Sequence, residues 1–296
     1  MTTLAPFELH RVTSVAEASG LHEELGEEAV YYSGGTELLL LMKLGFADYR
    51  HLIDVKPIEE LRSLSVREGT LVIGGAVTHR VLERSPLALD GWPDLVEMER
   101  RVANVRVRAT GSLGGNLAFA DPHSDPATFL LAAGASVVLG HGAERRMVSL
   151  EDFVQGPYET ALEHGELLCS IEIPPLPERA AMSHVRFAVH ERPAATVSVW
   201  LRAADGRVAD ARVAVGSVGI LPVLIPGAAR ALVGQGIDAI DDDVLDGVGT
   251  MGADVAEPAS DSNGSAEYKH ALTRTLIGRA ITEAAGKTSL SKETVS

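Results

Sequence analysis

The chain has 296 residues, enough for two domains, with 46% apolar but only 4% aromatic side chains. Its 41 acidic and 26 basic residues give a formal net charge of −15. This charge argues against binding nucleic acid or an anionic membrane, because phosphate groups need a positive surface. The single cysteine, Cys169, excludes a disulfide within the chain and an iron–sulfur cluster or cysteine-rich zinc site held by this chain alone.

The same features indicate a cellular location. Low cysteine use is typical of a reducing compartment. The N-terminal residues lack a basic start and an apolar signal core. The longest apolar run, Leu38 to Met42, is too short to span a bilayer. We therefore expect a cytoplasmic protein with no transmembrane segment.

The first half of the chain alternates predicted helices and strands. Ser14 and Glu17 form a capping box that opens a helix to about Leu25. Strands are predicted at residues 29–32, 51–55, 71–77, 136–139 and 167–173. Helices are predicted at 38–45 with Thr36 as cap, 78–84 with Thr78 as cap, 92–107, and 127–133.

Three prolines at 174, 175 and 177 break all periodicity, and we place the domain boundary there. Beyond it, residues 184–189, 196–203 and 207–215 alternate as antiparallel strands, with Asp205-Gly206 as a hairpin turn. Helices are predicted at 227–233, 242–251 and 266–285, before a polar tail at 287–296 that we expect to be frayed.

Two glycine-rich turns carry the chemistry that the sequence predicts. Gly34 and Gly35 follow a predicted strand, and Gly114 and Gly115 lie in a second turn from Gly111 to Asn116. A strand, a glycine turn and a helix start together present several backbone N–H groups to one point, which binds anions and phosphate most readily. One such turn is weak evidence, but two could close on both phosphates of a dinucleotide.

The sequence resembles the FAD-binding medium subunits of molybdenum hydroxylases. These are the aerobic carbon monoxide dehydrogenase and xanthine dehydrogenase type proteins. The similarity covers nearly the whole chain, in order. The matching segments are Ser33-Gly34-Gly35-Thr36-Glu37, Met42-Lys43-Leu44, His51 to Val55, Ile58 to Leu61, Ile73 to His79, Thr110 to Asn116, Asp121-Pro122 with Asp125, Gly165 to Leu168, Ile171 to Pro174, and Asn263 to Tyr268.

The resemblance implies an α+β fold. A two-subdomain FAD-binding PCMH-type domain, like that of vanillyl-alcohol oxidases, would occupy residues 1–176, and a small C-terminal domain of antiparallel sheet plus helices, of the carbon monoxide dehydrogenase flavoprotein type, would occupy 177–286. FAD would lie between the glycine turns. The implied cofactor-binding residues are Ser33, Gly34, Gly35, Thr36, Glu37, Ser112, Leu113, Gly114, Gly115, Asn116, Asp125, Leu168 and His190.

The resemblance also implies a task. FAD would take electrons from two-iron two-sulfur clusters of a small subunit, while a large subunit holds the molybdenum cofactor and hydroxylates the substrate. The flavin would pass the electrons to a quinone, NAD or oxygen. We expect a dimer of heterotrimers, with a peripheral place at the inner face of the membrane as an option. No catalytic side chain is required on this chain, since the isoalloxazine carries the redox chemistry.

Two departures from the family pattern stand out. The family's first turn commonly begins with alanine and ends in a glutamine–serine or histidine–serine pair, whereas here it runs from Ser33 to Glu37. A carboxylate beside a diphosphate is repulsive, so Glu37 must point away or contact a ribose hydroxyl or a cation. The family often has an aspartate near the flavin ring where this chain has Pro193, which leaves His190 and Arg192 as candidates there.

Several motifs have a plainer explanation. We do not predict a metal site from Asp121, His123 and Asp125, and Asp125 serves equally well as a helix N-cap or as an FAD contact. Asn116 either contacts the cofactor or satisfies its own loop. Cys169 is interpreted as a buried structural thiol.

Two further patterns are set aside in the same way. The Gly247-x-Gly249-x-x-Gly252 pattern is rejected as a dinucleotide fingerprint, because an acidic helical stretch and not a strand precedes it. The arginines at 100, 101, 106 and 108 are interpreted as a solvated helix face, with a subunit-docking surface as the alternative.

The main functional prediction is an FAD-binding electron-transfer subunit, with an aerobic carbon monoxide dehydrogenase type favoured. The alternatives are the FAD subunit of a xanthine, nicotinate or aldehyde dehydrogenase, or a self-contained flavin reductase on the same fold. A third hypothesis, from another class, is a scaffold whose flavin site has decayed, motivated by Ser33, Glu37 and the absent aspartate.

Overall fold

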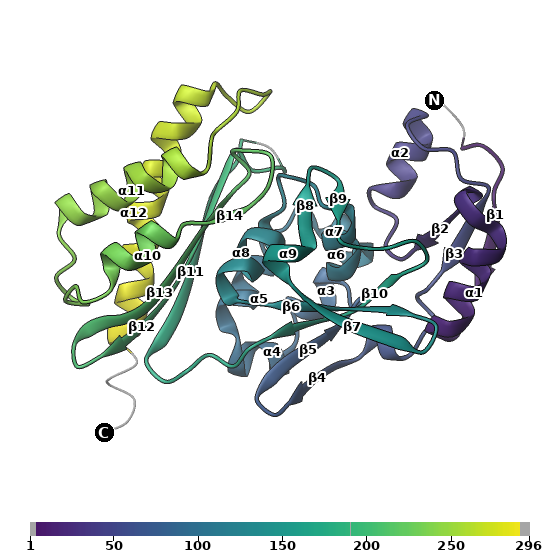
Figure 1. Ribbon diagram of the computed structural model, residues 1–296, viewed down its shortest axis with the longest axis horizontal. Coiled ribbons are helices and arrows are strands. Elements are labelled where there is room, and N and C mark those ends of the chain that lie inside the picture. Colours follow the sequence, from purple (N-terminus) through teal and green to yellow (C-terminus); the bar gives the residue numbers. More distant parts are fainter. Residues whose placement is uncertain (1–3, 190, 291–296) are drawn as a thin grey trace.

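The computed structural model describes residues 4–189 and 191–290. Three units lie side by side along the long axis (Figure 1). We call them the first subdomain (residues 8–54), the second subdomain (60–173) and the C-terminal domain (180–290). This is the α+β organisation implied by the resemblance, with two subdomains followed by an antiparallel sheet and helices.

The first subdomain is a three-stranded parallel sheet in the order β1-β3-β2. Its elements are β1 (Glu8–Arg11), α1 (Val15–Leu25), the 3-10 helix η1 (Gly26–Glu28), β2 (Ala29–Tyr32), α2 (Leu38–Leu44) and β3 (His51–Asp54). The capping box is confirmed, since the Glu17 amide donates to the Ser14 hydroxyl. Thr36 is not the cap of α2, because the N-cap position is occupied by Glu37 with no side-chain bond.

The second subdomain is an antiparallel sheet in the order β4-β5-β10-β6-β7 with helices beside it. Its strands are β4 (Leu64–Arg67), β5 (Thr70–Gly74), β6 (Ser136–His141), β7 (Glu144–Ser149), the short pair β8 (Val154–Gly156) and β9 (Glu159–Thr160), and β10 (Leu167–Ile173). Its helices are η2 (Glu60–Arg62), α3 (His79–Leu82), α4 (Pro86–Gly91), α5 (Pro93–Glu99), α6 (Val105–Thr110), α7 (Leu113–Phe119), α8 (Asp125–Ala133) and α9 (Leu150–Phe153).

The helix predicted at 92–107 is in fact two helices, α5 and α6. The chain turns between them at Ala103, whose φ is +41°. Asn104 then starts α6 by accepting hydrogen bonds from the amides of Arg106 and Val107. Asparagine is a strong N-cap residue, so Asn104 locally indicates the start of a second helix. The prediction of one helix followed the periodicity alone and missed it.

The C-terminal domain is an antiparallel sheet in the order β11-β12-β13-β14. Its elements are β11 (Ala180–Phe187), β12 (Ala195–Ala204), β13 (Arg207–Gly216), β14 (Val223–Leu224), α10 (Pro226–Leu232), α11 (Asp242–Val255) and α12 (Ala266–Leu290). The predicted hairpin turn is confirmed, with Asp205 and Gly206 both at positive φ. Strand β12 is buried on both sides, because α8 covers one face of the sheet and α12 the other.

Helix α12 is longer than expected and includes residues 287–290, which were predicted to begin the polar tail. Lys287 holds this last turn by donating to Asp94 at 2.5 Å and to the Met182 carbonyl at 2.9 Å. The rejected glycine pattern lies inside α11. An ideal Cβ on Gly249 would lie 2.7 Å from the Arg274 carbonyl, so this glycine allows α11 to pack closely on α12.

Candidate functional site

A cavity of about 730 Å³ lies where the two subdomains and the C-terminal domain meet. Its walls include the first glycine turn after β2, the start of α7, and residues 191–193 from the β11–β12 connection. The two glycine segments face each other across its floor, where the Ser33 and Ser112 hydroxyls are 2.9 Å apart. A volume of this size suits a cofactor and is typical of small-molecule sites.

The first turn is shaped by two glycines with different constraints. Gly35 has φ +69°, a conformation that side chains rarely adopt. Gly34 lies against the other glycine segment, and an ideal Cβ on it would be 2.4 Å from the Thr110 carbonyl oxygen. The contact between the two segments therefore leaves no room for a side chain at Gly34.

The second segment differs from the expected loop. Gly114 and Gly115 lie in the first turn of α7, and Ser112 is its N-cap, accepting from the Gly115 amide at 3.1 Å. Gly114 packs on the residue just after β5, since a Cβ there would lie 2.4 Å from the Gly75 carbonyl oxygen. Leu113 is fully buried in the core and is not among the described residues that line the cavity.

Backbone amides supply the positive character of the cavity floor. Within the described part of the chain, the N–H groups of Gly34, Gly35, Thr36, Glu37 and Gly114 donate to no acceptor. All five residues line the cavity. Because backbone N–H groups at such a site need an acceptor, the floor fits the diphosphate bridge of a dinucleotide.

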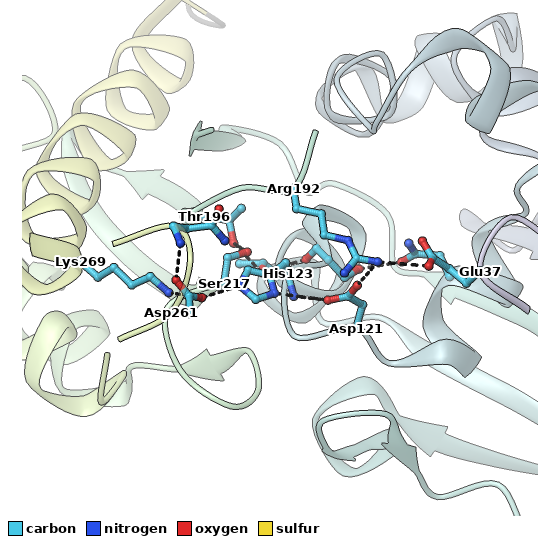
Figure 2. A network of polar contacts seen from close by, with 12 residues as sticks. Glu37, Asp121, His123, Arg192, Thr196, Ser217, Asp261 and Lys269 are labelled. Carbon is cyan, nitrogen blue, oxygen red and sulfur yellow. Dashed lines mark hydrogen bonds and ion pairs between the residues drawn. The ribbon is translucent and has the colours of Figure 1, made fainter. Parts of the chain in front are cut away.

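At one end of the cavity, Arg192 lies between two carboxylates. Its guanidinium is 3.1 Å from Glu37 and 3.0 Å from Asp121 (Figure 2). Glu37 was expected to point away or to contact a ribose hydroxyl or a cation, and Arg192 is that cation. Burial lowers the pKa of Arg192, but the charges of Asp121 and Glu37 outweigh this and raise it. Arg192 is therefore a permanent positive charge at the site.

The network continues into the C-terminal domain. His123 Nδ1 is 3.4 Å from Asp121, and its Nε2 is 3.0 Å from Asp261, which in turn pairs with the buried Lys269 at 2.6 Å (Figure 2). The hydrogen bond with Asp121 raises the pKa of His123, against the opposing effect of burial. Burial alone would raise the pKa of Asp121, but its bonds with His123 and the charge of Arg192 lower it.

Asp125 does not cap α8, because Ser124 is the N-cap and accepts from the Ala127 amide. The buried Asp125 carboxylate instead lies 3.2 Å from His184 and 3.3 Å from Arg186, both on β11. Asp125 also lines the cavity, so its cofactor role stays a prediction. Because these bonds hold Asp125 toward β11, it does not form a ligand set with Asp121 and His123.

Another part of the cavity wall is aromatic. The rings of His22 and Tyr31 stack with centroids 4.9 Å apart, and His164 meets His22 edge-on at the same distance. The Tyr31 hydroxyl donates to the Gly165 carbonyl, and burial raises its pKa to about 12. The predicted Leu168 also lines the cavity. Sequence reasoning missed His22, Tyr31 and His164, which share no motif and are brought together only by packing.

The remaining predicted residues have simpler positions. The Asn116 side chain accepts from the Ser124 hydroxyl at 2.6 Å and also lines the cavity, so its contact with the cofactor stays a prediction. His190 lies outside the described residues. Cys169 is buried as predicted, and burial raises its pKa to about 11. Arg101 is exposed in the turn after α5 and pairs with Glu97 at 2.7 Å.

Arg108 does not fit the solvated-face interpretation. It is half-buried and bonds to Glu83 and to the Val102 carbonyl. The two short helices α3 and α6 are therefore tied together by this arginine, and no single exposed basic surface runs along residues 100–108.

Comparison with known proteins gives two family matches. Residues 5–176 match the FAD binding domain in molybdopterin dehydrogenase, and residues 183–284 match the CO dehydrogenase flavoprotein C-terminal domain. The chain is 31% identical over 280 residues to the carbon monoxide dehydrogenase medium chain of Afipia carboxidovorans, covering 94% of this chain and 96% of that one. It is 30% identical to the nicotine 6-hydroxylase medium subunit of Paenarthrobacter nicotinovorans, covering 88% and 92%.

The fold is similar to that of a solved carbon monoxide dehydrogenase from Hydrogenophaga pseudoflava, with a TM-score of 0.92 and 31% identity over 97% of this chain and 99% of that one. Fold and family match together define an FAD-binding oxidoreductase subunit. The chain belongs to the FAD-binding medium subunits of the molybdenum hydroxylases, the family that includes carbon monoxide and xanthine dehydrogenases. No helix in residues 4–189 or 191–290 is long and apolar enough to cross a membrane.

Proposed function

We propose that this chain holds FAD in the 730 Å³ cavity and carries electrons for a complex of the aerobic carbon monoxide dehydrogenase type. The observation that carries the site assignment is the facing pair of glycine segments with unpaired amides. Those amides, with the hydroxyls of Ser33, Thr36 and Ser112, would hold the diphosphate. When bound, the isoalloxazine would supply the redox chemistry, so this chain needs only to bind it, orient it and set its electrostatic surroundings.

In this proposal the partners are a large subunit with the molybdenum cofactor and a small subunit with two-iron two-sulfur clusters, arranged as a dimer of heterotrimers. Electrons would arrive from the clusters and leave to a quinone or NAD. The complex would be cytoplasmic, with a peripheral place at the membrane as a further option. Support comes from the relatives, which are named as medium chains or medium subunits of larger enzymes.

The choice of carbon monoxide rests on the 31% identity to a carbon monoxide dehydrogenase medium chain. A second candidate is a hydroxylase for an N-heterocycle, favoured by the 30% identity to a nicotine 6-hydroxylase subunit. The two candidates predict the same flavin site here, because the substrate would be bound by the large subunit.

The test is to purify the complex through a tag on this chain and assay what comes with it. We expect flavin, molybdenum and iron in constant ratio and dye reduction driven by carbon monoxide. Reduction driven by nicotine or xanthine but not by carbon monoxide would replace the first candidate with the second. A chain that purifies alone, without flavin, and does not bind added FAD would overturn both.

A further inference from the structure

Three potential metal ligands meet at the edge of the first subdomain's sheet, outside the flavin cavity. Glu8 and His10 belong to the edge strand β1, and His51 begins β3. In the parallel register of these strands, Glu8 is opposite His51 and His10 is opposite Ile53. Alternate residues of a strand point to the same face, so all three side chains lie on one face of the sheet.

The ligand atoms of these side chains point at one another. His10 Nε2 is 3.0 Å from His51 Nδ1, and the Glu8 carboxylate is 3.9 Å from His10 and 3.7 Å from His51. A tetrahedral zinc ion has bonds of about 2.0–2.2 Å to nitrogen and oxygen, so its ligand atoms are about 3.3–3.6 Å apart. The observed separations bracket this value, and an ion would fit after side-chain shifts of a few tenths of an ångström.

We propose that Glu8, His10 and His51 form a binding site for a zinc-like transition-metal ion. Two imidazoles and one carboxylate are ligands that zinc accepts, whereas magnesium and calcium prefer sites built of oxygens alone. Both imidazoles are half-buried and Glu8 is exposed, so three ligands come from the protein and the fourth position faces solvent. No sequence motif indicates this set, because His10 and His51 are 41 residues apart.

The site would join β1 to the rest of the sheet. Strand β1 pairs only with β3, and the described chain places it at the sheet edge. An ion held by Glu8 and His10 on β1 and by His51 on β3 would cross-link the two strands at their start. The competing explanation is a plain hydrogen bond between two neutral histidines, which needs no ion and gives the same 3.0 Å contact.

The two explanations separate in a metal titration of the full chain loaded with FAD. Zinc chloride is titrated calorimetrically into metal-free protein, and cobalt chloride is titrated in parallel while visible absorption is recorded. We expect one equivalent of zinc to bind at these residues. We expect the cobalt-loaded protein to show the absorption spectrum of tetrahedral cobalt. His10→Ala and His51→Ala should each weaken that equivalent roughly 100-fold, since loss of an outer-shell partner alone commonly costs about 10–100-fold. Magnesium should give no heat at this site.

The matched control is His270→Ala, which removes a histidine that pairs with Asp254 in the C-terminal domain. It should leave the zinc affinity unchanged. Flavin absorption and the thermal midpoint without zinc check that each variant is folded, and zinc should raise the midpoint of the wild type and of His270→Ala only. Equal zinc stoichiometry and affinity in the wild type and in a His10→Ala/His51→Ala double variant would overturn the proposal, as would the absence of binding to the wild type.

Discussion

The Ser33 hydroxyl lies 2.9 Å from the Ser112 hydroxyl, although 79 residues separate the two. Ser112 is also the N-cap of α7 and accepts from the Gly115 amide. One hydroxyl group therefore fixes both the start of a helix and the position of the turn facing it. The floor of the proposed flavin cavity depends on this contact, because the unpaired amides come from both sides of it.

Replacing Ser112 by alanine removes the cap and the link to Ser33 together. We expect a loss of about 1 kcal/mol in the free energy of unfolding, as for other N-cap serines, and in addition weaker FAD binding. Ser85→Ala is the control, since Ser85 caps α4 in the same way but does not line the cavity. Titration of FAD-depleted protein by flavin fluorescence should separate them. Equal affinities in the two variants would show that the link does not matter for binding.

Gly34→Ala should reduce FAD binding more than the addition of one methyl group indicates. The added methyl group would lie 2.4 Å from the Thr110 carbonyl oxygen, so the two glycine segments would have to separate. We expect the purified variant to contain little flavin, measured as the ratio of visible to protein absorption. Gly20→Ala, in α1, has nothing within 4 Å of the new methyl and should keep its flavin. Full flavin content in Gly34→Ala would contradict the proposed position of the diphosphate.

Arg192→Ala tests the charge balance at the other end of the cavity. Without the guanidinium, Glu37 loses this cation and Asp121 is left with His123, so more negative charge faces the cofactor. The Arg192 side chain is 50% exposed, so its ion pair with Glu37 contributes only about 0.2–1 kcal/mol, and FAD should bind up to roughly fivefold more weakly.

Two further variants define the cause of that loss. Adding Glu37→Gln to Arg192→Ala should restore most of the affinity if repulsion is responsible. Arg279→Ala removes an exposed arginine that pairs with Glu283 on α12, and it should have no effect on FAD binding. If the double variant binds no better than Arg192→Ala, the arginine acts by packing and not by charge.

Asp261→Asn should destabilise the C-terminal domain. Lys269 is only 1% exposed, and Asp261 is its ion-pair partner at 2.6 Å. Removing one partner of a buried pair commonly costs about 3–5 kcal/mol, because a buried charge is left uncompensated. Urea denaturation should show the loss, and Lys269→Met in the same chain should recover much of it. Unchanged stability in Asp261→Asn would mean that water already solvates Lys269.

The same network predicts how stability changes with pH. The pKa of His123 is raised above its ordinary 6.5, chiefly by Asp121, so its contribution is complete below pH 6.5 and is lost as the pH rises through the folded-state value. Asp261 behaves in the opposite sense. Burial opposes ionisation, but Lys269 and His123 lower its pKa from 3.8 to about 2, so its contribution is present above pH 3.8 and is lost as the pH falls toward 2.

The measurement is the free energy of unfolding in urea at several pH values, for the wild type and for His123→Gln. The difference between the two should be largest between about pH 4 and 6.5 and should shrink at alkaline pH. A difference that grows with rising pH would show that neutral, not protonated, His123 is the stabilising form.

Local sequence patterns predicted much of the scaffold. The Ser14 capping box, the helix ending at Gly134 and the Asp205-Gly206 hairpin were all correct, because each depends on residues a few positions apart. The edge strands β4 and β7 were not predicted. Both are partly exposed, β4 is only four residues long and β7 lacks a clear apolar alternation, so their strand conformation depends on pairing with β5 and β6.

The site was predicted in part for the same reason. Gly34 and Gly35 come just after β2, and that local arrangement predicts an anion-binding turn. Asp125 illustrates the opposite case, because its neighbours predict a cap while its partners His184 and Arg186 come from another domain. Glu37 could be recognised as needing a cation, but nothing near it in the sequence identifies Arg192.

Short-range geometry therefore determined which backbone groups could bind a diphosphate, since φ values and capping depend on adjacent residues. The resemblance to a family added the expectation that the diphosphate belongs to FAD. Only the tertiary structure decided which charges meet at the cavity, how far α12 extends, and that Glu8 and His10 lie beside His51. These contacts join residues far apart in the chain, and they form only when burial of the three apolar cores brings their strands and helices together.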